Sequence, residues 1–500
     1  MKLSFKRTAS LALAALMAGG AFMLAGCSGS TSNSGGNTPT TAPASPASTG
    51  TTAYTANVPA NDYGGADFTI CYMDWHSGQG GVWDHRDVVA EGETGDSIND
   101  AVYKRNQDID ARFNINIVGN RITDPTPTTT VIKQTVLAGD STYDVFMPVI
   151  NEYNTSAMAG YLDDFKTMQY VDLTQPWWDQ NCADNLTISG RLYGMESDIT
   201  LLDKDSTTAL VFNKTLLQTL GLSSPYDMVR NGTWTLDTFG TMVKSYSKDV
   251  NGDGKMDSND AYGYLYERDS VMGMLNACDQ RIAAPNSSGG IDLTIGTAGA
   301  MSALTDIFNL IYDQQHCENV MIAYTDALFP TMMVQQFADS RGLFMWIRIG
   351  DCTNLRTATT DFGILPQPKF DTTQTQYFSS VNPYVASVIC VPTSVSDENR
   401  AAIILEALSA ESKNLVQPAY YDVVLDSKTL RDDDSKQMLD IIFGNRIYDI
   451  GDIFYLGKMG DIIQDTMTYK NDVASFIASH QTAAQSDIDK MLAAYASLPQ

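Results

Sequence analysis

An alternation of strand and helix patterns between residues 67 and 149 constrains the fold of this chain more than any other feature. Apolar side chains occupy every second position from Phe68 to Tyr72, which predicts a strand over residues 67–73. A helix is expected over residues 97–112, with Ser97 as its N-cap, and a second strand over 114–118. A second helix follows around 131–137, and then a third strand over 144–149. Strands separated by helices in this way predict a parallel sheet with right-handed crossovers.

A second block of the same kind begins near Thr207. Apolar runs predict strands over residues 210–212, 262–265, 342–347, 362–365 and 384–391. Thr235 is expected to cap a helix over 236–248, and helical patterns recur over 300–315, 331–338, 398–410 and from 435 onward. A body that runs from residue 62 to residue 500 suits two α/β domains better than one core.

The N-terminus carries the parts of a bacterial lipoprotein signal in their usual order. Three basic residues precede an apolar run over 10–24, which is too short and too rich in small residues for a membrane span. The run ends in Leu24-Ala25-Gly26-Cys27, which resembles a lipobox. We therefore expect a signal peptide over 1–26, removal of that peptide, and a lipid on Cys27. The alternative is an ordinary signal peptide with a chance cysteine.

Residues 27–61 predict a flexible tether behind this anchor. After the cysteine the segment consists almost entirely of Ser, Thr, Gly, Pro, Asn and Ala and carries no charge, so it cannot bury enough apolar surface to offset its ordering entropy. No later stretch is long and apolar enough to span a bilayer, which makes the lipid the only expected membrane contact. The expected location is the extracellular face of the cell membrane.

Charge and cysteine content exclude several classes of partner and site. The formal net charge of −27 disfavours nucleic acid and anionic lipid surfaces as partners. Of the seven cysteines, the six beyond Cys27 are widely spaced and form no CxxC pair, so a zinc or redox motif is not expected. Disulfide pairing among these six stays open.

Short motifs in a fixed order along the chain resemble those of extracellular solute-binding proteins of ABC importers. They occur at 95–103 (GDSINDAVY), 172–179 (DLTQPWWD), 212–217 (FNKTLL), 232–237 (GTWTLD), 362–366 (FGILP), 418–425 (PAYYDVVL) and 445–449 (NRIYD). In type, the chain is most similar to the maltose-binding-protein-like carbohydrate binders.

That resemblance implies the type II periplasmic-binding-protein fold, with two α/β lobes that each hold a mainly parallel sheet flanked by helices. The implied lobes are 62–200 with 379–412 and 201–378 with 413–500, joined by crossing segments near 197–205, 370–380 and 410–418. The implied function is that of a monomeric binding protein, not an enzyme, that closes on a sugar or oligosaccharide by hinge motion and delivers it to the permease subunits of an ABC importer.

Candidate ligand residues lie where strands of such sheets end. Sugar sites pair aromatic rings with carboxylates and amides, and these types recur in the expected loops of lobe one and at the end of a lobe-two strand. The candidates are Trp75, Asn151, Trp177, Trp178, Asp179, Trp346 and Arg348. The competing interpretation is that each tryptophan belongs to the core.

Ligand identity stays open at this stage. The glycine-proline pair often seen before the corresponding tryptophan of maltose binders is missing around Trp346. The same fold can bind a cationic or peptide-like solute, because carboxylates and aromatic rings also hold cations. It can also serve a sensor subunit that hands its ligand to a receptor.

A lipid-anchored hydrolase is a remote alternative. Gly95-Asp96-Ser97 resembles the nucleophile motif of one esterase class, and Asp313 with His316 could complete a triad. Ser97, however, suits a helix N-cap, and the Asp/His pair falls at the end of an ordinary amphipathic helix. We therefore expect no catalytic residues.

Residues 249–260 predict a structural calcium site. Oxygen-bearing side chains occupy positions one, three, five, nine and twelve of a calcium-loop pattern, with a glycine at position six and a backbone carbonyl at position seven. The expected ligands are Asp249, Asn251, Asp253, Lys255 through its carbonyl, Asp257 and Asp260. A strand rather than a helix should follow, which makes this half an EF-hand. The alternative is an Asp/Gly-rich turn without metal.

Overall fold

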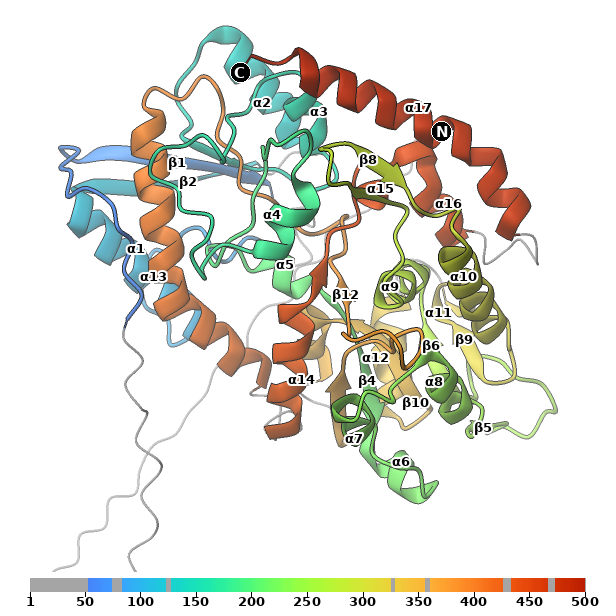
Figure 1. Ribbon diagram of the computed structural model, residues 1–500. Helices are drawn as coiled ribbons and strands as arrows, with labels where there is room; N and C mark the ends of the chain where they lie inside the picture. Colours follow the sequence, from blue (N-terminus) through green and yellow to red (C-terminus); the bar gives the residue numbers. More distant parts are fainter. Residues whose placement is uncertain are drawn as a thin grey trace, which may run out of the picture. The chain divides into compact units, whose positions relative to one another are not determined.

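The computed structural model describes residues 53–73, 83–122, 127–324, 329–355, 360–425, 433–465 and 473–499 (Figure 1). The chain from Ala53 to Gln500 forms one compact unit. Within the ranges just given, no helix has both the length and the apolar character needed to cross a membrane. Cys27 and Trp75 lie outside the described residues.

The first sheet has three parallel strands in the order β2-β1-β3. They are β1 (Ala66–Met73), β2 (Ile115–Ile122) and β3 (Val145–Met147), connected through helices α1 (Ser97–Phe113) and α2 (Thr128–Ala138). The alternation read from the sequence is therefore confirmed. The cap of α1 differs from the prediction, because Asp96, not Ser97, is the N-cap and accepts from Asn99 N at 2.9 Å.

The second sheet is mixed and follows the order β11-β4-β10-β6-β5, with β9 also paired to β6. Its strands are β4 (Thr208–Asn213), β5 (Ser247–Lys248), β6 (Ala261–Tyr266), β9 (Cys317–Asn319), β10 (Gly342–Arg348) and β11 (Phe362–Leu365). β6 runs parallel to β9 and β10, whereas β4 is antiparallel to both of its neighbours. The mainly parallel sheet expected here is thus only partly parallel.

The remaining elements flank and connect these sheets. Helices are α3 (Tyr153–Met158), α4 (Gln180–Leu186), α5 (Leu202–Asp205), α6 (Lys214–Thr219), α7 (Pro225–Arg230), α8 (Leu236–Val243), α9 (Ser270–Ala277), α10 (Ala298–Ile311), α11 (Val320–Ala323), α12 (Phe329–Ala338), α13 (Glu398–Leu425), α14 (Asp433–Gly444), α15 (Ile450–Ile453), α16 (Met459–Asp465) and α17 (Val473–Ser497). The others are η1 (Ile349–Leu355), η2 (Leu456–Lys458) and the two-stranded pairs β7 (Ala283–Pro285) with β8 (Ile291–Leu293) and β12 (Ser379–Ser380) with β13 (Arg446–Ile447).

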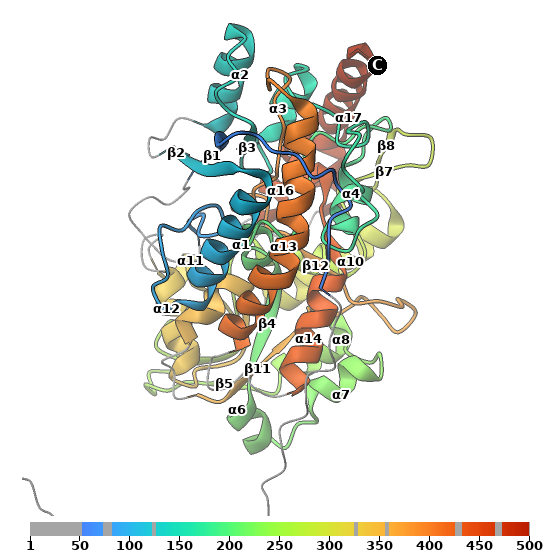
Figure 2. The same ribbon diagram turned by 90° about the vertical axis from the view of Figure 1, so that its left-hand side faces the viewer.

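Three predicted elements differ in extent. α8 keeps the predicted Thr235 cap but ends at Val243, since Ser247 and Lys248 pair with β6 as strand β5. Residues 384–391 form only isolated bridges, such as Phe146 with Cys390, because the neighbouring strand β3 is too short for a ladder. α13 continues past residue 410 to Leu425 with Pro418 inside it. Figure 2 shows α13 alongside α1, against which it packs.

The end of the predicted tether packs on the body. Tyr54 N donates to Asn414 Oδ1 at 2.9 Å, and Asn414 Nδ2 donates to the Tyr54 carbonyl at 2.8 Å. Ala56 is only 3% exposed, and the Tyr54 ring meets Trp177 edge to face. Two hydrogen bonds between the Tyr54 backbone and the Asn414 side chain, together with apolar burial, therefore hold the end of the segment against the body. The sequence predicts that these residues belong to the flexible tether.

Candidate functional site

Parallel strands of both sheets end next to polar and charged residues. β6 is followed directly by Glu267, Arg268 and Asp269, and its parallel neighbour β10 ends at Arg348. In the first sheet, Asn151 follows the end of β3. The carboxyl ends of parallel strands are where α/β sheets hold their ligands.

Arg348 joins connections that belong to different sheets. Its guanidinium lies 4.9 Å from the ring centroid of Trp83, which is part of the connection between β1 and α1, and 5.6 Å from that of Trp346. Its Nε donates to Asp351 Oδ2 at 3.1 Å. Burial acts to lower the pKa of Arg348, but the charges of Asp351 and Glu267 outweigh burial and raise that pKa. Arg348 therefore keeps its positive charge at this edge, and the contacts with the Trp83 and Trp346 rings hold the guanidinium in place.

A chain of polar contacts continues from the same strand ends. Asn151 Nδ2 donates to the Tyr455 hydroxyl at 2.7 Å, and the rings of Tyr455 and Tyr384 meet edge to face at 6.0 Å. The Tyr384 hydroxyl donates to Asp461 Oδ1 at 2.7 Å, and a guanidinium nitrogen of Arg268 lies 3.2 Å from the same oxygen. The side chains of Arg268 and Asp461 are 31% and 34% exposed, so solvent reaches this chain of contacts.

We call this set the strand-end cluster and define it as Trp83, Asn151, Arg268, Arg348, Tyr384, Tyr455 and Asp461. Its members come from the β1–α1 connection, the loop after β3, the ends of β6 and β10, and the segments 382–384 and 455–461. Burial, followed by the charge of Asp461, raises the pKa of Tyr455 to about 12, so its hydroxyl stays protonated at neutral pH. The cluster offers aromatic rings with both donors and acceptors, which suits a ligand rich in hydroxyl groups.

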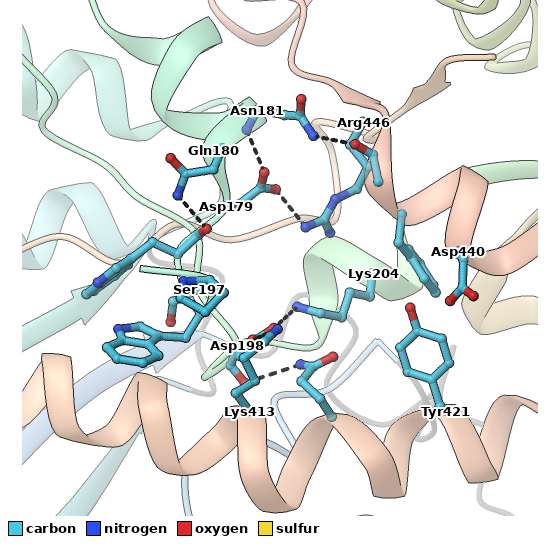
Figure 3. Close-up of a pocket in the computed structure, with 16 residues that line it drawn as sticks. Asp179, Gln180, Asn181, Ser197, Asp198, Lys204, Lys413, Tyr421, Asp440 and Arg446 are labelled. Atoms are coloured by element: carbon cyan, nitrogen blue, oxygen red, sulfur yellow. Dashed lines mark hydrogen bonds and ion pairs between the residues drawn. The ribbon is translucent and has the colours of Figure 1, made fainter. Parts of the chain in front are cut away.

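A separate cavity of about 400 Å³ holds three other predicted residues, Trp177, Trp178 and Asp179 (Figure 3). Both rings are almost fully buried, at 3% and 2% exposure, and Trp178 Nε1 donates to Glu406 Oε2 at 2.8 Å. Asp179 caps α4 by accepting from Asn181 N at 2.9 Å. In this structure the two indoles are core side chains rather than open platforms.

The charges around this cavity are already paired with one another. Arg446 lies 2.6 Å from Asp179, and Lys413 lies 3.0 Å from Asp198, as the dashed lines in Figure 3 show. Lys204 also lies 3.1 Å from Asp203, which approaches Arg446 at 2.5 Å. These charges are paired within the protein and both indoles are buried, whereas Trp83, Tyr384 and Tyr455 of the strand-end cluster are half-buried, so the cavity is the weaker candidate.

The predicted ligand residues therefore divide into two places. Asn151 and Arg348 belong to the strand-end cluster, and Trp346 is fully buried beneath Arg348. Trp177, Trp178 and Asp179 line the separate cavity. A ligand-binding role for these residues stays a prediction.

Sequence reasoning missed most of the strand-end cluster. The rule about strand ends was sufficient to find Arg268, because it follows β6 directly. Tyr384, Tyr455 and Asp461 carried no such signal, since they come from irregular or short elements late in the chain. Tyr455 also has a left-handed backbone conformation, with φ of 52°, which no local sequence pattern predicts.

The predicted calcium loop connects β5 to β6. Its carboxylates accept backbone hydrogen bonds within the loop: Gly254 N donates to Asp249 Oδ2 and Val250 N to Asp260 Oδ1, each at 2.8 Å. Burial acts to raise the pKa of Asp260, but hydrogen bonds from backbone N–H groups outweigh burial and lower it. Across the residues that the structure describes, no group of three or more His, Cys, Asp or Glu side chains is placed to hold a metal ion. Calcium binding therefore stays a prediction.

All six cysteines of the described body, from Cys71 to Cys390, are free and buried. Burial raises the pKa of the Cys71 thiol to about 12. The six cysteines, whose pairing the sequence left open, are therefore thiols in this structure and pack as small apolar side chains.

Solved structures share this fold, although sequence comparisons find no relative. No protein-family model and no curated protein matches the chain. The ABC substrate-binding protein Lmo0181 from Listeria monocytogenes, in complex with cycloalternan, is 14% identical over 86% of this chain and 99% of its own, with a TM-score of 0.53. UspC from M. tuberculosis is 16% identical over 84% and 99%, with a TM-score of 0.54.

A third neighbour is the maltose/maltodextrin-binding domain MalE from Bdellovibrio bacteriovorus bound to maltotriose, which is 13% identical over 85% of this chain and 100% of its own, with a TM-score of 0.53. The chain therefore has the fold of ABC substrate-binding proteins, and the expected type II periplasmic-binding-protein class is confirmed. Two of these neighbours are binding proteins by name. The predicted lobe boundaries stay predictions.

The geometry gives no support to the hydrolase alternative. Ser97 opens α1, whereas the His316 ring contacts Asp313 at 2.9 Å just before β9. No hydrogen bond joins Ser97 to His316, both of which are described residues, so a triad is not assembled.

Proposed function

We propose that this chain is an extracellular, lipid-anchored substrate-binding protein that captures a sugar or oligosaccharide and delivers it to an ABC importer. The fold favours a clamp that closes around a solute. The single observation that carries the proposal is the strand-end cluster, in which residues from the connections of both sheets contact each other at the carboxyl ends of their strands.

The chemistry of the cluster suits a carbohydrate. Trp83, Tyr384 and Tyr455 supply ring faces or edges for the flat C–H surfaces of a sugar ring. Asn151 and Asp461 supply amide and carboxylate groups that can exchange their present hydrogen bonds for ligand hydroxyls. Sugars are also the ligands named for two structural neighbours, cycloalternan and maltotriose.

Titration calorimetry with a panel of neutral oligosaccharides, including maltotriose, tests the proposal. Tyr384→Phe removes the hydroxyl that donates to Asp461, and we expect sugar affinity to fall about fivefold, which corresponds to about 1 kcal/mol for one hydrogen bond. Tyr421→Phe is the matched control, because Tyr421 lines the separate cavity.

Three outcomes are informative. Loss of sugar affinity in Tyr384→Phe but not in Tyr421→Phe supports the strand-end cluster as the ligand site. Loss with Tyr421→Phe alone moves the ligand site to the cavity that holds Trp177 and Trp178. A panel of saccharides without binding, beside clear binding of a peptide, contradicts carbohydrate capture.

A further inference from the structure

Carboxylates outnumber cations around the strand-end cluster. Two guanidinium groups, Arg268 and Arg348, interact with five carboxylates, namely Glu267, Asp269, Asp351, Asp452 and Asp461. Asp351 pairs with Arg348 and Asp461 with Arg268, while Asp269 accepts from Asn382 Nδ2 at 2.7 Å and lies 3.8 Å from Arg268. Both cations are therefore already occupied.

One carboxyl oxygen of Glu267 has no hydrogen-bond donor among the described residues, although the charges of Arg348 and Arg268 act on the group. Its side chain follows β6 directly, the residue is 3% exposed, and Oε1 is buried with no hydrogen-bond partner. Asp452 is also buried, and its Oδ1 likewise has no partner among the described residues. An unpaired buried acceptor costs free energy in proportion to the desolvation it suffers, so such groups in a site point to a donor that arrives from outside.

The electrostatic setting of Glu267 favours a cationic donor over a neutral one. Burial, followed by the charge of Asp269, raises the pKa of Glu267 to about 8. The free carboxyl therefore holds a proton through much of the neutral range. An ammonium group placed beside it would favour the ionised form and would also offset the excess of neighbouring carboxylates.

We propose that the solute is a carbohydrate with a free amino group, whose ammonium ion pairs with the Glu267 carboxylate. This inference rests on the proposed function, because the sugar ring is bound by the aromatic and polar groups of the strand-end cluster. It adds a class of sugar, the unacetylated amino sugars, which carry a positive charge on each free amino group, whereas neutral and N-acetylated sugars carry none.

The experiment compares four probes by titration calorimetry on the body of the protein. They are oligomers of glucosamine with free amino groups, the same oligomers after N-acetylation, neutral maltooligosaccharides, and spermidine as a cation without a sugar ring. We expect the glucosamine oligomers to bind about tenfold or more tightly than their N-acetylated forms, since acetylation removes the charge that pairs with the buried carboxylate.

Glu267→Gln keeps the shape of the side chain, removes its charge, and replaces one acceptor oxygen by an amide donor. Affinity for glucosamine oligomers should fall about tenfold, and affinity for neutral oligomers should stay nearly unchanged. The matched control is Glu318→Gln, another buried glutamate, which accepts from Gln336 Nε2 at 2.5 Å and whose pKa burial raises to about 7. That substitution should leave all four affinities unchanged.

The outcomes separate this inference from the proposed function. Equal affinity for glucosamine oligomers and their N-acetylated forms overturns the inference and leaves sugar capture intact, as does a preference for neutral oligomers. Binding of spermidine with no saccharide binding overturns both. The comparison of probes on the wild-type protein stays decisive if Glu267→Gln fails to fold.

Discussion

Arg446 holds two buried carboxylates at the cavity beside α4, and its replacement by methionine should be strongly destabilising. The guanidinium lies 2.6 Å from Asp179 and 2.5 Å from Asp203, and the three side chains are 7%, 6% and 0% exposed. Arg446→Met keeps most of the volume, removes the cation paired with Asp179, and leaves Asp203 with Lys204 as its remaining cation. Breaking a buried pair in this way costs about 3–5 kcal/mol of unfolding free energy.

Arg230 provides the matched control on the surface. It also contacts two carboxylates, Asp227 at 3.1 Å and Asp434, but its side chain is 33% exposed. Exposed pairs contribute little because water and salt screen them, so Arg230→Met should change the unfolding free energy by less than about 1 kcal/mol. Both variants begin from an arginine with two aspartate partners, so burial is the main difference between them.

Urea titration followed by tryptophan fluorescence measures both variants. Urea is preferable to guanidinium chloride because the ionic denaturant screens the charges under test. Adding Asp179→Asn to Arg446→Met should recover part of the loss, since it removes the charge that has lost its ion-pair partner. Equal losses from the Arg446 and Arg230 variants, or no recovery in the double variant, would refute the assignment of a buried ion network.

Three further predictions test separate parts of the molecule. The calcium that we propose for residues 249–260 should appear as one binding event by calorimetry, with a lower melting temperature in chelator, and Asp253→Ala should abolish both effects; no heat from calcium would leave the loop a simple turn. Cys27→Ala should release the protein from membranes or leave the signal attached, as fractionation and mass measurement would show, whereas a cleaved variant that stays on the membrane contradicts the lipid anchor. Burial raises the pKa of Glu406 to about 7, so the folded protein favours the protonated form and loses stability as pH rises from about 4.5 to 7. Glu406→Gln should reduce this pH dependence of the unfolding free energy in urea titrations, and an unchanged profile would contradict the role of Glu406.

The sequence predicted the parts of the fold that depend on local patterns. Strands β1, β4, β10 and β11 are apolar runs that become buried strands, and their positions agree with the expected ones. Helix α8 begins at its predicted cap, because a threonine side chain that accepts from the backbone is a local signal. The order of parallel strands in the first sheet followed from the same alternation.

The sequence could not predict outcomes that depend on distant partners. Residues 384–391 have a strand-like pattern, yet their neighbours are the short strand β3 and isolated residues, so only bridges form. Trp177 and Trp178 resembled open sugar platforms because they adjoin each other in a polar segment, but Glu406 and Tyr54, both far away in sequence, cover them. Burial of an aromatic ring is set by tertiary packing, and the sequence around it does not encode that packing locally.

The two candidate sites differ in how their buried carboxylates are paired, and this difference supports our proposal that the ligand binds at the strand-end cluster. At the cavity, Asp179 and Asp198 each pair with a cation of the chain itself, which stabilises the fold and leaves those carboxylates satisfied without a ligand. Beside the strand-end cluster, Glu267 is equally buried and lies near Arg348 and Arg268, but its Oε1 has no hydrogen-bond partner among the described residues. An unpaired buried carboxyl oxygen costs the folded protein stability. A bound donor would remove that cost, so a ligand that pairs with Glu267 should also raise the free energy of unfolding of the protein.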